Sequence, residues 1–81
     1  MTDLTYDLVS LRVGECVALA ELDIDDKDLC GILNYQGGLM RGLMLAGEPV
    51  NSATFRLEYD YMMILRDRAL EARVRTDVHI G

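Results

Sequence analysis

The chain has 81 residues, of which 51% are hydrophobic, and it carries a formal net charge of −6 at pH 7. This length predicts a single domain over residues 1–81 whose core is only marginally stable by itself, and the apolar share argues against disorder and for an oligomer. No charge-free stretch approaches the ~20 residues that a membrane span needs, and the acidic N-terminal residues do not resemble a signal peptide. We therefore expect a cytoplasmic protein.

The charge is unevenly distributed along the chain. Residues 1–48 contain nine acidic and three basic residues, whereas residues 49–81 contain five of each. The acidic half would repel phosphate backbones, so we expect no direct nucleic-acid binding. A protein partner with a basic surface is the better fit.

The first predicted element is a helix over Asp3–Leu22, where two patterns compete. In a helix, one side carries Val9, Val13, Cys16 and Val17, and the opposite side carries a row of leucines. In a strand, Leu4–Val13 would partly alternate between apolar and polar residues, and Gly14 would mark the change of state. The helix is favoured, and the strand stays open as an alternative.

A second helix is predicted over Lys27–Ala46. Either Asp25 or Asp26 can cap its first turn. A heptad-like seam with one polar member runs along it: Leu29, Ile32, Gln36, Leu39, Leu43 and Ala46. Gly37-Gly38 lowers helix stability by roughly 1 kcal/mol per glycine, so two short helices hinged at this pair, or a hairpin turning there, are alternatives to a continuous helix.

On another side of this second helix lie Gly31, Gly38 and Gly42, which would let a neighbouring backbone approach closely. Gly47-Glu48-Pro49 then predicts its end, because glycine commonly follows a helix and proline cannot continue one.

The third predicted helix, Ser52–Arg75, is capped by Asn51 or Ser52 and should run antiparallel to the second. From Val74 to Ile80 the residues alternate, which predicts a short C-terminal strand or an ordered tail. The expected fold is mainly α, with three helices, or four if the second one breaks, around an antiparallel helical hairpin.

The third helix has more apolar surface than one neighbour can cover. At ~100° per residue its apolar residues fall on two sides. One side carries Phe55, Tyr59, Met62, Met63, Ala69 and Leu70, and the other carries Leu57, Tyr61, Ile64 and Ala72. The hairpin covers one side, so the other predicts a homodimer.

The residues expected at interfaces follow from this pattern. Met and Tyr are enriched at the centres of interfaces, and an arginine on an apolar stripe must reach an acid or water. We therefore predict an interface formed by Leu57, Tyr61, Ile64, Met62, Met63 and Arg66. A basic partner would meet the acidic cluster of Asp23, Asp25, Asp26 and Asp28.

Motifs for cofactors, metals and catalysis are weak in this sequence. The acidic cluster departs from a calcium loop at both diagnostic positions, where Asp28 and Asn34 stand in place of Gly and Glu. His79 has no cysteine at a zinc-site spacing. The helical pattern places Cys16 on an apolar face. With no CxxC motif and no secretion signal, buried, reduced thiols are favoured over a disulfide for both cysteines, Cys16 and Cys30. No cofactor or metal is expected.

Three functional hypotheses follow, in decreasing order of support. The first is a non-enzymatic, homodimeric adaptor, chaperone or inhibitor, which would also suit a phage or mobile element. The second is an acidic nucleic-acid mimic that inhibits a DNA-binding protein. The third is a small enzyme in which Cys16 or Cys30, His79, or carboxylates such as Glu15 and Glu58 converge at a dimer cleft.

Overall fold

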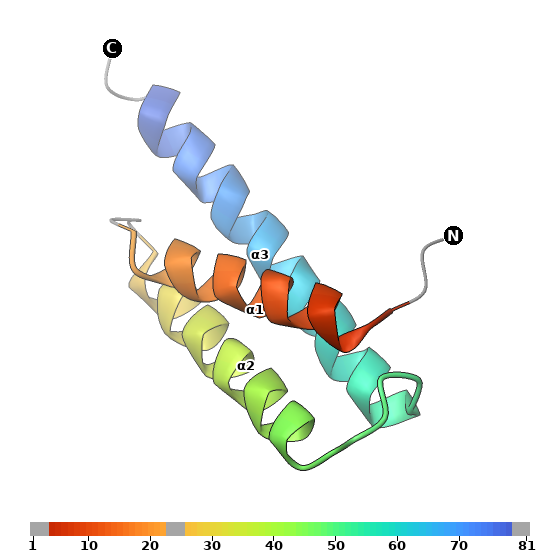
Figure 1. Cartoon of the computed structure of the whole chain (residues 1–81). Coiled ribbons are helices and arrows are strands. Elements are labelled where there is room, and N and C mark those ends of the chain that lie inside the picture. The colour runs from red at the N-terminus through yellow and green to blue at the C-terminus, as the bar shows by residue number, and fades with distance from the viewer. Residues whose placement is uncertain (1–3, 23–25, 79–81) are drawn as a thin grey trace.

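The structure, a computed structural model, describes residues 4–22 and 26–78, with side chains of the last helix through residue 72. Its described part consists of three helices: α1 (Tyr6–Ala20), α2 (Lys27–Leu45) and α3 (Ala53–Val78). Figure 1 shows α2 and α3 as an antiparallel pair with α1 lying across them. The prediction of a small helical domain with a helical hairpin is confirmed.

Helix α1 begins where Thr5 accepts a hydrogen bond from the backbone N–H of Leu8 through its side chain, at 3.2 Å. A side-chain cap of this kind satisfies one of the backbone donors that a helix leaves unpaired in its first turn. The chain is helical from Tyr6 onward, so the strand alternative for Leu4–Val13 is wrong. The valines that suggested a strand instead face the core.

Helix α2 is continuous through Gly37-Gly38, so neither the hinge nor the hairpin alternative holds. Asp26 caps its N-terminus, where its carboxylate accepts from the Leu29 N–H at 3.0 Å. At the other end Gly47 adopts a φ of 78°, a left-handed conformation that glycine tolerates. Backbone hydrogen bonds from Gly47 to Met44 and from Glu48 to Leu43 close this end, which is the predicted glycine stop.

Helix α3 begins directly after Ser52, whose hydroxyl accepts a hydrogen bond from the Phe55 N–H at 3.1 Å. It then runs for 26 residues to Val78. The predicted C-terminal strand is therefore wrong for its described part, Val74–Val78; residues 79 and 80 lie outside the described residues. Adding a residue to an existing helix forms one hydrogen bond per residue ordered, whereas a lone strand has no edge to pair with.

The core lies where the three helices meet. Its largest fully buried side chains come from all three helices: Phe55, Leu33, Met40, Met62, Val9, Val13 and Cys16. At the crossing of α1 and α2, a Cβ placed on Gly37 would lie 3.3 Å from Val17 Cγ2. Gly37 therefore lets the two helices approach closely. The sequence pattern had assigned this role to Gly31, Gly38 and Gly42.

The heptad-like seam predicted for α2 coincides only in part with the observed core: Gln36 is buried, and Leu29 and Leu43 pack against the core. The buried residues of this helix are Leu33, Gln36, Gly37 and Met40, whereas Ile32 is 44% exposed and Ala46 is also exposed. A Cβ on Gly31, Gly38 or Gly42 would meet nothing within 4 Å. The structure thus leaves these three glycines without the close neighbour that the sequence suggested.

None of the described helices combines the length and apolarity of a membrane-spanning segment.

Candidate protein-binding surface

A line of exposed apolar side chains runs along the outer side of α3. Leu57, Tyr61 and Ile64 are 68%, 45% and 51% exposed. Their spacing of four and three residues places them on one side of the helix, opposite the buried Phe55 and Met62. We call Leu57, Tyr61 and Ile64 the α3 face.

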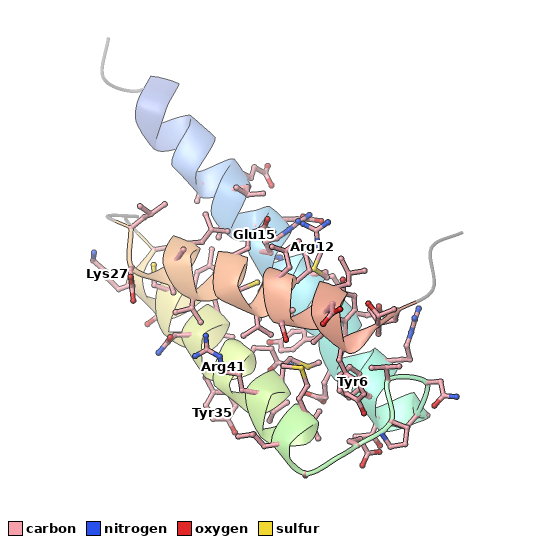
Figure 2. The ribbon with its side chains drawn as sticks, viewed as in Figure 1. Tyr6, Arg12, Glu15, Lys27, Tyr35 and Arg41 are labelled. Carbon is pink, nitrogen blue, oxygen red and sulfur yellow. The ribbon has the colours of Figure 1, made fainter. Side chains whose placement is uncertain are left out.

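A groove between α2 and α3 borders this face. Ile32 of α2 and Tyr61 of α3 both line it, together with the buried Leu65. Asp26, Asp28 and Arg68 line the same groove, so charged groups flank its apolar part. The exposed apolar surface of α3 therefore continues onto α2. Figure 2 shows that Tyr35, 69% exposed, points outward from α2 on the side away from α1.

The other predicted interface residues of α3 lie elsewhere. Met62 is fully buried in the core, and Met63 is partly buried against it. Arg66 is largely enclosed, with 19% of its side chain exposed. Met62 thus has no surface to offer a partner, and the outer surface of α3 is carried by Leu57, Tyr61 and Ile64 alone among the predicted set.

Arg66 joins α3 to α1 through an ion pair. Its guanidinium donates to Glu15 Oε1 at 2.7 Å and to Asp67 Oδ1 at 2.9 Å. Its hydrogen bonds to these two carboxylates raise the pKa of Arg66, so the side chain stays charged. Arg12 pairs with the other oxygen of Glu15 at 3.3 Å, and Figure 2 shows these two side chains together on α1. Of the two outcomes expected for Arg66, contact with an acid or with water, the structure shows contact with acids.

A polar contact inside the hairpin aligns α2 with α3. The buried Gln36 donates through Nε2 to the Glu58 backbone carbonyl at 3.0 Å and to its carboxylate at 2.8 Å. Shifting either helix by one residue would leave this buried amide unpaired, which is unfavourable by about 1–3 kcal/mol. Glu58 and Glu15, the two carboxylates of the enzyme hypothesis, thus bind different partners.

Cys16 is a fully buried thiol in the core, as predicted, and Cys30 is a separate, partly buried thiol. Burial raises the pKa of Cys16 from 9.0 to about 11, and the charge of Glu15 adds to the rise. A thiol with a raised pKa is a poor nucleophile at neutral pH, because the thiolate is the reactive form. His79, the other nucleophile or base considered, lies outside the described residues.

The raised pKa of Cys16 makes stability depend on pH in alkaline solution. Above pH 9 the unfolded chain loses this thiol proton, while the folded chain keeps it until about pH 11. Stability should therefore fall between pH 9 and 11, by at most about 1.4 kcal/mol per pH unit from this group. Urea unfolding of the wild type and Cys16→Ala measures it, since the variant should show a shallower decline. Equal declines in both proteins would contradict the assignment.

Half of the predicted acidic cluster lies within the described chain. Asp26 is the cap of α2, and Asp28 stands exposed in the first turn of that helix. Asp23 and Asp25 lie outside the described residues. Within the residues that the structure describes, no three histidine, cysteine or carboxylate side chains gather as metal ligands would.

Two residues of this surface were not predicted from the sequence. Ile32 was expected in the α2 seam, and Leu65, which lines the groove from below, was in neither apolar side of α3. On a helical projection, Leu65 lies between the buried Met62 and the exposed Tyr61. Its burial therefore shows that α2 packs against this side of α3. The partner of Arg66 had no comparable signal, because Glu15 is distant in sequence.

Comparisons of the chain with protein-family models, with curated proteins and with solved structures find no match.

Proposed function

We propose that this protein is a non-enzymatic protein-interaction module that acts as a homodimer through the α3 face. The observation that carries the proposal is the exposure of Leu57, Tyr61 and Ile64 in one line on the longest helix. Burying apolar surface contributes roughly 25 cal/mol per Å², and tyrosine is enriched at interface centres. A second chain that covers this line would supply the neighbour that α3 lacks on its outer side.

The dimer would act by occluding or scaffolding another protein, as an adaptor, chaperone or inhibitor does. The net charge of −6 and its concentration in residues 1–48 favour a partner with a basic surface. Asp28 is exposed for such a contact, while Asp26 is already engaged as a helix cap. We place this activity in the cytoplasm, because Cys16 and Cys30 stand as separate thiols.

The proposal predicts that the wild type is a dimer at micromolar concentration and that Tyr61→Glu weakens it at least about tenfold. The substitution places a carboxylate within the contact, and burying an unpaired charged group is unfavourable by more than about 1–3 kcal/mol. Sedimentation equilibrium measures the dissociation constant. Circular dichroism checks that α3 remains helical.

Leu45→Glu is the matched control. Leu45 ends α2 and is 89% exposed, so the same change of charge falls away from the α3 face. This variant should keep the dissociation constant of the wild type. A strictly monomeric wild type at micromolar concentration would refute the homodimer, and equal weakening by both variants would refute its location.

A further inference from the structure

Two exposed charges of opposite sign flank the α3 face. Asp60 and Arg68 are both exposed, and neither forms an ion pair with another described residue. They are eight residues apart, which corresponds to about 12 Å along a helix, and Ile64 lies midway between them. Reversing the helix direction about Ile64 therefore exchanges the positions of the acid and the base.

The two charges also lie at different lateral positions on the helix. Arg68 lines the groove on the α2 side, and it extends the line of Leu57, Tyr61 and Ile64 by one further step. At ~100° per residue, Asp60 falls on the other side of that line. In two antiparallel helices packed face to face, residues on the same side of the line meet, and a residue that lies almost on the line, as Arg68 does, can reach either side of the other helix.

From this placement we propose that two copies of the chain pair through antiparallel α3 helices, with the two-fold axis near Ile64. Arg68 of each copy then lies opposite Asp60 of the other, and symmetry forms this ion pair twice. Tyr61 and Ile64 pack at the centre, and Leu57 lies towards each end. This inference rests on the proposed homodimer and specifies its geometry.

A parallel arrangement brings like charges together. Because Arg68 lies almost on the line, a two-fold axis parallel to α3 would place it against its own copy, and Asp60 would have no base opposite it. Like charges at an interface are unfavourable and suppress the wrong geometry. The complementarity of Asp60 and Arg68 under antiparallel symmetry is also the reason that a second copy, rather than an unrelated helix, is the occupant of the α3 face.

The test uses two single charge reversals, measured apart and then mixed. Asp60→Arg places two arginines opposite each other at both ends of its own dimer, and Arg68→Asp places two aspartates there. Each variant alone should dissociate about tenfold more readily than the wild type, since both ion pairs are lost and like charges opposite each other oppose binding. In an equimolar mixture the arginines of one chain meet the aspartates of the other. A heterodimer with nearly wild-type affinity should then form.

Sedimentation equilibrium measures the dissociation constants of the wild type, of each reversal and of the mixture, and native mass spectrometry identifies the heterodimer. Glu21→Arg and Arg41→Asp are the controls, because both residues are exposed, Glu21 directly after the C-terminal end of α1 and Arg41 on α2, away from the α3 face. Each control should dimerise like the wild type. If the wild type is a monomer, the proposed function fails together with this geometry. If the wild type is a dimer but the mixture shows no rescue, or neither reversal weakens it, the antiparallel pairing alone is refuted.

Discussion

Replacing Phe55 by alanine is expected to lower the free energy of unfolding by about 3–5 kcal/mol. Phe55 is fully buried near the start of α3. Its ring meets Tyr6 of α1 edge to face, with centroids 6.1 Å apart and an interplanar angle of 89°. The Tyr6 hydroxyl in turn donates to the Glu48 carbonyl in the connection between α2 and α3. Removing the ring therefore leaves a cavity where all three helices are held together.

Leu57→Ala is the matched control for this core truncation. It removes a large apolar side chain only two residues away, but from a site that is 68% exposed, so its effect on the monomer should stay within about 0.5 kcal/mol. Urea unfolding below the dimer dissociation constant, followed by circular dichroism, compares the two variants. If Phe55→Ala is already unfolded without urea, the milder Phe55→Leu gives a free energy of unfolding that can still be measured. If Phe55→Ala and Leu57→Ala lowered the free energy of unfolding equally, the assignment of Phe55 to the buried side of α3 and of Leu57 to its exposed side would be wrong.

The ends of the helices were predictable because the signals that set them are local. Asp26 and Ser52 each bind a backbone N–H three residues further along, and Gly47 supplies the positive φ that ends α2. Such contacts depend on a few neighbouring residues, so a sequence pattern contains them. The C-terminal end of α3 lacks a signal of this kind, and alternation beyond Val74 suggested a strand although the helix continues to Val78.

The buried face of α2 was harder to predict. Its apolar residues surround much of the helix, so a rotation that buries Leu33 and Met40 fits the pattern as well as one that buries Ile32 and Leu39. The choice is made by the neighbouring helices: Gly37 admits Val17 from α1, and Gln36 reaches Glu58 on α3. Both are long-range contacts between side chains, which periodicity along one helix does not record.

The candidate surface was predictable where α3 itself determines it. The separation of Phe55 and Met62 from Leu57, Tyr61 and Ile64 follows from helix geometry alone, and the structure buries the first pair and exposes the other three. The extension onto α2 through Ile32 depends on how the hairpin packs. The same holds for Arg66. The sequence predicts that this side chain must reach an acid or water, but its partner Glu15 depends on how α1 packs against α3.

Substituting alanine at Gly31, Gly38 and Gly42 together should stabilise the folded chain by about 2–3 kcal/mol. These glycines lie inside α2, where each lowers helix stability by about 1 kcal/mol relative to alanine, partly because it leaves the unfolded chain more freedom. An added Cβ at any of them meets nothing within 4 Å, so the gain is not offset by a clash. Urea unfolding of the wild type and the triple variant measures the difference.

Gly37→Ala is the control within the same helix. Its new Cβ would lie 3.3 Å from Val17 Cγ2 and 3.8 Å from Val13 Cγ1, so α1 must shift slightly to admit it. The same gain in helix propensity is then opposed by crowding, and Gly37→Ala should stabilise less than Gly38→Ala. A triple variant that is less stable than the wild type at dimer-forming concentrations, but more stable below them, would mean that the second copy packs on the glycines of α2. That outcome would place the dimer contact on α2 instead of on the α3 face. The glycine variants and the charge reversals at Asp60 and Arg68 therefore test the same dimer geometry.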